Sequence, residues 1–176
     1  QQPAIAGFEQ VPTSPDASRG WQPVSDLRLR VGIVGYGVCQ FGAAFSFQDH
    51  PNVEIVAVSD LVPAQCAALA RACRCDKTYP SLEELVKDDR IEAVFVATDA
   101  PSHARHCLEV LRHGKHVATA VPAVFGSLED ADQVFEAVKK SGLQYMMFET
   151  SCYHEDLHAM RKIYQAGGLG EIVYSE

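Results

Sequence analysis

The chain has 176 residues, of which 47% are hydrophobic and 22% charged, and its 23 acidic side chains outnumber 15 lysines and arginines to give a net charge of −8. The apolar content suits a packed core and excludes a wholly disordered chain, while the acidic balance argues against a general nucleic-acid binder. The longest uncharged stretch, residues 31–48, carries four glycines, so we expect no membrane-spanning helix. No cluster of basic residues suits an anionic membrane surface either.

Residues 1–28 differ from the rest of the chain, because prolines and glycines interrupt every helical or strand periodicity there. We interpret this stretch as an arm or linker that Phe8 and Trp21 could anchor, and that could reach a neighbouring subunit of a homo-oligomer. The compartment stays open: six cysteines without a disulfide pattern slightly favour the cytoplasm, whereas a Pro-rich arm without an initiator Met suits an exported protein. We expect the cysteines to be mostly small buried hydrophobic residues.

From residue 30 onward, short apolar strands alternate with helical patterns. The expected strands are residues 31–34, 53–58, 93–97, 116–118, 144–148 and 172–174. The expected helices are residues 39–48, 64–73, 81–87, 102–113, 127–140 and 155–165, with Ser81 and Ser127 as N-caps. Continuous apolar strands between amphipathic helices are typical of a parallel sheet covered on both faces. We therefore predict an α/β fold with a doubly wound, mainly parallel sheet of six or seven strands.

A glycine-rich turn follows the first expected strand and opens the first expected helix. Gly35 and Gly37 have the spacing of a dinucleotide fingerprint, and Asp60 ends the next strand 25 residues after Gly35. The first glycine permits the tight turn, and the second lets a pyrophosphate approach the backbone of Gly37 and Val38 at the helix N-terminus. Asp60 would accept hydrogen bonds from the adenosine ribose and repel a 2′-phosphate, so NAD is favoured over NADP.

One position departs from this fingerprint. Gln40 stands where a third glycine would let the helix pack closely on the strand, and Gly42 follows two residues later. A side chain at residue 40 could push the helix outward. A doubly wound fold that binds no dinucleotide therefore stays open as an alternative.

Several segments together resemble the N-terminal half of the Gfo/Idh/MocA family, named for glucose–fructose oxidoreductase and inositol dehydrogenase. The resemblance covers roughly residues 30–176 and rests on Gly35-Tyr36-Gly37, Val58-Ser59-Asp60, Val96-Ala97-Thr98 with His103, Gly114-Lys115-His116-Val117, Pro122, and the run from Ala166 to Ile172. It implies a Rossmann domain of an NAD(P)-dependent oxidoreductase acting on a sugar- or polyol-like alcohol. The family's second α/β domain would be absent or truncated in this chain.

The resemblance also implies which residues surround the cofactor. Thr98, Pro101 and His103 would border the adenine and nicotinamide riboses, and Pro122 at a strand end would face the nicotinamide. The family's usual catalytic lysine has no counterpart, because Val121 stands in its place and a valine cannot transfer a proton. The alternative function is a non-catalytic Rossmann module that acts by binding or assembly.

Candidates for the missing proton-transfer group follow the strand expected at residues 144–148. Tyr153 and His154 are the predicted catalytic residues, with Glu149 nearby, because ligands of doubly wound folds bind at the carboxyl ends of the strands. The run from His154 to His158 also matches the HExxH pattern of zinc proteases. A third zinc ligand is not evident, so we expect no metal site.

These observations divide the chain into three parts: an arm at residues 1–28, a dinucleotide-binding domain at residues 29–150, and a helix and strand at residues 151–176 that lead into a second domain. The expected partner is a small sugar or polyol, with neither nucleic acid nor membrane involved. The expected function is hydride transfer between this alcohol and the nicotinamide.

Overall fold

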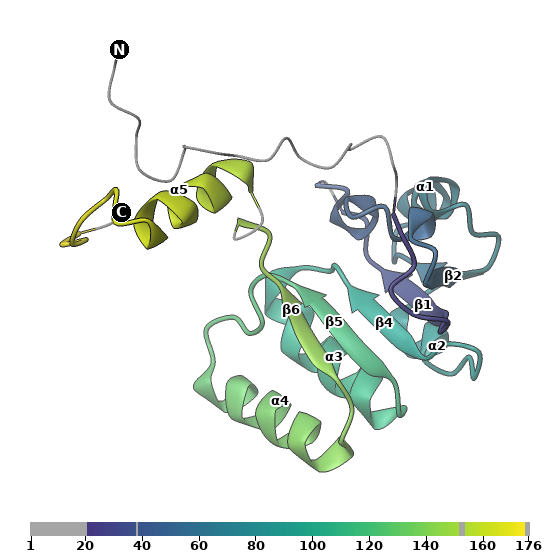
Figure 1. The fold of residues 1–176 in the computed structure, drawn as a ribbon. Coiled ribbons are helices and arrows are strands. Elements are labelled where there is room, and N and C mark those ends of the chain that lie inside the picture. Colours follow the sequence, from purple (N-terminus) through teal and green to yellow (C-terminus); the bar gives the residue numbers. More distant parts are fainter. Residues whose placement is uncertain (1–20, 38, 152–153, 175–176) are drawn as a thin grey trace. The chain divides into compact units, whose positions relative to one another are not determined.

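The computed structural model describes residues 21–37, 39–151 and 154–174. Within them, six parallel strands form one sheet in the order β3-β2-β1-β4-β5-β6 (Figure 1). The strands are β1 (Leu29–Val34), β2 (Val53–Ser59), β3 (Thr78–Tyr79), β4 (Ala93–Val96), β5 (His116–Ala120) and β6 (Tyr145–Phe148). The predicted parallel α/β fold is confirmed. The two-residue strand β3 was missed, because it is too short to show a periodicity.

Helices cover both faces of this sheet, as a doubly wound fold requires. These helices are α1 (Pro63–Cys73), α2 (Leu82–Leu85), α3 (His103–Arg112) and α4 (Leu128–Ser141), whereas α5 (Glu155–Gln165) belongs to a separate unit. Side chains of α2, α3 and α4 pack with Val34, Val94 and Val96 on one face, and α1 packs with Ile33 and Phe95 on the other.

Two of these helices begin at the serines that the sequence identified as caps. The Ser81 hydroxyl accepts a hydrogen bond from the Glu84 amide at 3.3 Å, and the Ser127 hydroxyl accepts one from the Asp130 amide at 3.1 Å. Each bond satisfies an amide that has no partner within the first helical turn. The predicted capping is therefore confirmed for α2 and α4.

The prediction of a helix at residues 39–48 is wrong. Two short 3₁₀ turns, Phe41–Ala43 and Phe47–Asp49, replace it. The ring centroids of Phe45 and Phe47 lie 5.6 Å and 5.3 Å from that of Phe95 on β4. In a continuous α-helix, residues two apart point to different sides, so Ser46 between them adopts a left-handed conformation with φ 49°. Burial of the aromatic side chains thus prevails over local helix formation.

The strand predicted at residues 172–174 is also absent from the described part of the chain, where these residues have no regular secondary structure and are exposed. A strand is stable only when a neighbour pairs with its backbone. These residues, like α5, belong to a unit separate from the one formed by Trp21–Phe148. Apolar β-branched residues alone therefore did not suffice to predict a strand.

The last part of the predicted arm belongs with the sheet. Asn52 before β2 accepts a hydrogen bond from the Val24 amide at 2.8 Å and donates one to the Ser25 carbonyl at 2.7 Å. The ring of Trp21 lies 5.0 Å from that of His50. Residues 21–28 are therefore attached to the loop before β2. Phe8 lies outside the described residues.

Four of the six cysteines are buried, as predicted: Cys66, Cys73, Cys75 and Cys107. Burial raises the pKa of Cys73 to about 11 and that of Cys107 to about 12. These thiols stay protonated at neutral pH and act as small apolar side chains. Cys39 is exposed, and Cys152 lies outside the described residues.

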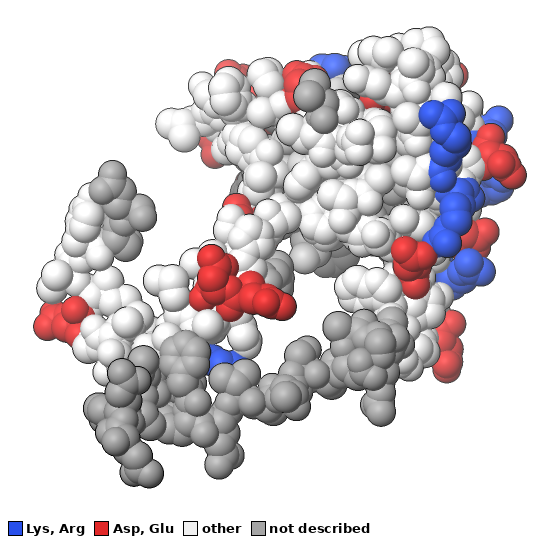
Figure 2. Space-filling model, turned by 90° about the horizontal axis from the view of Figure 1, so that it is seen from above, with Lys and Arg blue, Asp and Glu red and all other residues white. Residues whose placement is uncertain are grey.

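The surface shows charges of both signs. Basic side chains lie next to acidic ones along one flank in the space-filling view (Figure 2). Ion pairs join Arg30 to Glu92 at 3.2 Å and Arg28 to Glu54 at 3.7 Å. None of the helices among the described residues is long and apolar enough to span a membrane.

Candidate functional site

A cavity of about 670 Å³ opens at the carboxyl ends of the central strands. Its wall includes Gly35 and Gly37 after β1, Asp60 after β2, Thr98 after β4 and Val121 after β5. The chain turns from β1 towards β2 on one side and returns to β4 on the other, so the cavity lies where the strand order reverses. Ligands of doubly wound folds bind at this switch point, and the volume is typical of small-molecule sites.

Glycines allow the backbone to approach closely on one side of this cavity. Gly35 has φ 93°, and a Cβ atom there would lie 2.4 Å from the carbonyl oxygen of Ala97. A Cβ atom on Gly42 would lie 2.2 Å from the carbonyl oxygen of Gly35. Gly42 therefore provides the close packing expected of the third glycine in the fingerprint. Gln40 is exposed with φ 54°, so its side chain does not separate the turn from the sheet.

Gly37, unlike Gly35 and Gly42, is not crowded by neighbouring backbone atoms. It adopts φ 55°, and no described atom lies within 4 Å of the place where its Cβ atom would be. Gly37 lines the cavity, so this open space is part of the cavity itself. A phosphate group can therefore approach this backbone, and the turn fits the pyrophosphate of a dinucleotide. Val38, predicted to share this contact, lies outside the described residues.

Asp60 connects two segments at the cavity. One carboxylate oxygen accepts a hydrogen bond from the Tyr36 amide at 2.9 Å, and the other accepts one from the Val62 amide at 2.8 Å. This side chain thus holds the glycine turn against the start of α1, a role that sequence reasoning missed. A carboxylate has about four acceptor positions, so capacity remains for ribose hydroxyls.

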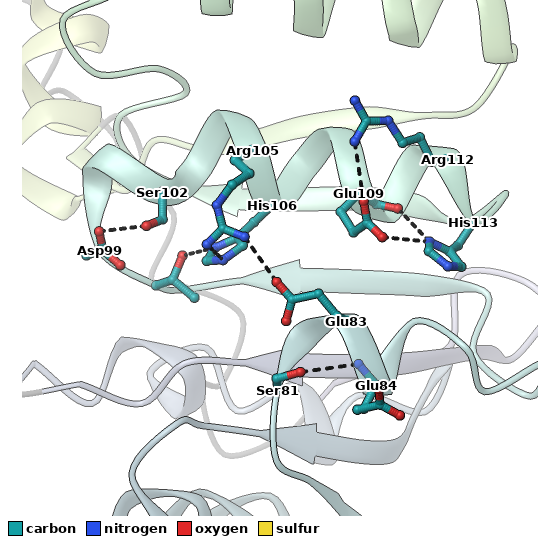
Figure 3. A network of polar contacts seen from close by, with 11 residues as sticks. Ser81, Glu83, Glu84, Asp99, Ser102, Arg105, His106, Glu109, Arg112 and His113 are labelled. Atoms are coloured by element: carbon teal, nitrogen blue, oxygen red, sulfur yellow. Dashed lines mark hydrogen bonds and ion pairs between the residues drawn. The ribbon is translucent and has the colours of Figure 1, made fainter.

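Thr98, an expected contact residue, lies on the cavity wall in a polar group whose other members, Glu83, Arg105 and His106, were missed (Figure 3). The Thr98 hydroxyl lies 2.8 Å from Nδ1 of His106, and Nε2 of the same ring lies 2.7 Å from the Arg105 guanidinium. Arg105 in turn donates to Glu83 of α2 at 3.0 Å. Desolvation and, after it, the charge of Arg105 lower the pKa of His106. All four side chains line the cavity.

Three other predicted contact residues lie outside the cavity wall. His103 is fully buried, with its ring nitrogens 2.6 Å from the Pro122 carbonyl and 3.0 Å from the Thr98 carbonyl. It therefore joins the loops after β4 and β5, and the expectation that it borders a ribose directly is corrected. Pro101 and Pro122 are exposed but do not line the cavity.

The predicted catalytic residues belong to the separate unit that begins at Glu149. His154 is exposed and precedes α5, while Tyr153 lies outside the described residues. Hydrogen bonds from Ser151 lower the pKa of Glu149. Among the described residues, no three His, Cys, Asp or Glu side chains group as metal ligands, so the HExxH pattern on α5 lacks a third ligand there.

Comparisons with known proteins agree with this geometry. A family model described as "Oxidoreductase family, NAD-binding Rossmann fold" (GFO_IDH_MocA) matches residues 29–149. Glycosyl hydrolase family 109 protein 1 of Bacteroides fragilis is 28% identical over 157 residues, which are 84% of this chain and 34% of the relative. The chain thus spans about a third of the length of this curated relative.

Two solved structures extend the comparison. Myo-inositol 2-dehydrogenase from Lactobacillus plantarum has the same fold, with a TM-score of 0.75 at 20% identity over 84% of this chain and 44% of that one. GenD2 from gentamicin A biosynthesis, solved in complex with NAD, has a TM-score of 0.68 at 27% identity over 78% of this chain and 38% of that one.

Proposed function

Because the chain belongs to the Gfo/Idh/MocA oxidoreductase family and contains its NAD-binding Rossmann domain, we propose that it is the cofactor-binding part of an enzyme that transfers hydride between the nicotinamide and a hydroxyl-bearing carbon of a carbohydrate or polyol. The observation that carries this proposal is the cavity at the switch point, with an open Gly37 on one side and Asp60 on the other. The carbohydrate substrate is supported by relatives named as glycosyl hydrolases and by the fold shared with inositol dehydrogenases.

The residues of the cavity favour NAD over NADP. The turn at Gly37 would hold the pyrophosphate, and Asp60 would accept hydrogen bonds from the adenosine ribose. Three carboxylates, of Asp60, Glu83 and Asp99, and one guanidinium, of Arg105, lie on the described cavity wall. Since Arg105 already pairs with Glu83, a 2′-phosphate would meet net negative charge there.

The proton of the alcohol needs an acceptor that the described cavity wall does not supply near β5. Ala120 and Val121 are apolar there, and the bound nicotinamide supplies only the hydride acceptor. We therefore assign proton transfer to groups after β6, with His154 and Tyr153 as the first candidates. A protein that retained cofactor binding without such a group would be a binding module, which is the second candidate function.

The relatives named as glycosyl hydrolases support a variant of the enzymatic function. In it the cofactor stays bound and is reduced only transiently while a glycosidic bond is broken. Net oxidation of the substrate and accumulation of NADH are then not expected. The two enzymatic variants therefore differ in a directly measurable product.

The test uses the product of the complete open reading frame with NAD⁺, a panel of polyols and a panel of aryl glycosides. NADH formed in proportion to substrate would support the dehydrogenase, and release of the aryl alcohol without NADH would support the transient variant. In either case His154→Asn should lower kcat about a hundredfold or more at unchanged NAD⁺ affinity. If a protein that binds NAD⁺ turns over neither panel, the enzymatic proposal fails in favour of the binding module.

A further inference from the structure

His103 begins α3, and its side chain is completely buried between two loops. Nδ1 lies 2.6 Å from the carbonyl oxygen of Pro122, in the loop after β5. A carbonyl oxygen can only accept a hydrogen bond, and so close an approach requires a hydrogen between the two atoms. Nδ1 therefore donates to Pro122. Nε2 lies 3.0 Å from the carbonyl oxygen of Thr98, in the loop after β4, and donates there when the ring carries a second hydrogen.

Helix α3 gives this ring a fixed position. Cys107 and Val110 of the helix are buried together with Val94 of β4 and Val117 of β5. The ring of His103 thus belongs to an element of the core, whereas both of its acceptors belong to loops. Since a close-packed core moves little, the bonds from His103 hold these loops at a set distance from the sheet.

The two loops depend on His103 to different degrees. Thr98 is also held through its hydroxyl, which lies 2.8 Å from Nδ1 of His106. Residues 122–126 are exposed or half-buried, and among the described residues only His103 forms a hydrogen bond with them. The bond to the Pro122 carbonyl is therefore the main polar attachment of the loop after β5.

The loop after β5 borders one half of the cavity. Gly37 and Asp60, which we assign to the pyrophosphate and the adenosine ribose, follow β1 and β2. A dinucleotide bound across the switch point places its other half towards β4 and β5. Thr98 and Val121 line the cavity there, and Val121 directly precedes Pro122. The nicotinamide half is thus the part of the ligand that this loop would contact.

We propose that His103 is a positioning residue for the nicotinamide half of the bound dinucleotide, because its bond to the Pro122 carbonyl orders the loop that follows Val121 before the ligand arrives. The inference rests on the proposed function, since it concerns the same cofactor. Without this bond the ligand has to order the loop on binding, and the affinity falls by the cost of that ordering. ADP lacks the nicotinamide half, so its affinity does not depend on the bond.

Two substitutions separate the two bonds of His103. The side-chain nitrogen of asparagine is as many bonds from Cβ as Nδ1 of histidine, and that of glutamine is as many as Nε2. His103→Asn can therefore still donate to Pro122, whereas His103→Gln can donate only to Thr98. Both variants replace the same buried ring, so a loss of stability alone would not distinguish them.

The experiment is calorimetric titration of the full 176-residue chain with NAD⁺ and, separately, with ADP. We expect His103→Gln to bind NAD⁺ roughly three- to tenfold more weakly than the wild type, which is the contribution of one hydrogen bond. His103→Asn should stay within about twofold, and ADP should bind all three proteins alike. His113→Gln is the matched control, because His113 is exposed at the end of the same helix and bonds to the Glu109 carbonyl at 2.9 Å. It should bind both ligands as the wild type does.

Three results for His103→Gln would overturn the inference and leave the proposed function intact: unchanged affinity for NAD⁺, an equal loss for ADP, or a loss no larger than that of His103→Asn. If His103→Gln does not fold, Pro122→Gly decides, because it loosens the same loop at an exposed residue. It should weaken NAD⁺ binding about two- to fivefold at unchanged ADP affinity, and equal affinity for NAD⁺ would overturn the inference. A wild-type chain that binds neither NAD⁺ nor ADP would overturn the proposed function itself.

Discussion

Gly42→Ala is expected to destabilise the domain by about 3 kcal/mol or more, because overpacking against a rigid neighbour costs this much. The new Cβ atom would lie 2.2 Å from the carbonyl oxygen of Gly35 and 3.3 Å from the side chain of Ile33. The neighbour is backbone of the glycine turn, so relief of the clash must move the turn itself. Binding of NAD⁺ should therefore be lost together with stability.

Thermal unfolding followed by circular dichroism measures this effect, with an expected decrease of Tm by roughly 10 °C. Gly142→Ala is the matched control. Gly142 has φ 68°, and no described atom lies within 4 Å of its added Cβ atom, so the cost is only that of a left-handed alanine, about 1 kcal/mol. Equal losses in the two variants would contradict the role assigned to Gly42.

Asp60→Ala is expected to weaken NAD⁺ binding at least about a hundredfold, since two hydrogen bonds to a charged group contribute roughly 1.5–3 kcal/mol each and every 1.4 kcal/mol is about tenfold in affinity. The substitution removes the acceptor for the amides of Tyr36 and Val62 and the acceptor proposed for the ribose. Asp60→Asn should be damaging as well, because an amide offers only one acceptor oxygen and its NH₂ group would face a backbone donor. The carboxamide no longer repels a 2′-phosphate, so the preference for NAD⁺ over NADP⁺ should narrow.

Calorimetric titration of each variant with both dinucleotides tests this prediction. Asp132→Ala, which removes an exposed carboxylate on α4, serves as the control for the change in net charge and should bind as the wild type does. Affinity of Asp60→Ala for NAD⁺ within twofold of the wild type would show that neither the turn nor the ribose depends on this carboxylate.

The elements of the sheet were predictable because their signals are local. Mostly apolar runs marked the five longer strands, and capping serines together with periodicity marked the helices on both faces. The region after Gly37 was not predictable, since its conformation depends on the packing of Phe45 and Phe47 against Phe95 of a strand almost fifty residues later. Local propensity is overridden there by burial of aromatic rings.

The candidate site likewise contains residues that the sequence could predict and contacts that it could not. Gly35, Gly37 and Asp60 follow the spacing of a dinucleotide fingerprint, so the sequence was enough to predict that they lie together, and all three line the cavity. The contacts of Glu83 with Arg105 and of His106 with Thr98 join three elements whose approach depends on how α2 and α3 pack. No spacing in the sequence marks such a group. The burial of His103 was equally invisible, because a motif identifies a residue but not the direction of its side chain.

The central claim is that the cavity at the switch point binds a nicotinamide dinucleotide through the glycine turn and Asp60. Calorimetric titration of the chain with NAD⁺ and, separately, NADP⁺ tests it most directly. We predict saturable binding of one molecule per chain, tighter for NAD⁺ than for NADP⁺. A chain that is folded by circular dichroism and binds neither dinucleotide, alone or as the complete open reading frame, would contradict the claim.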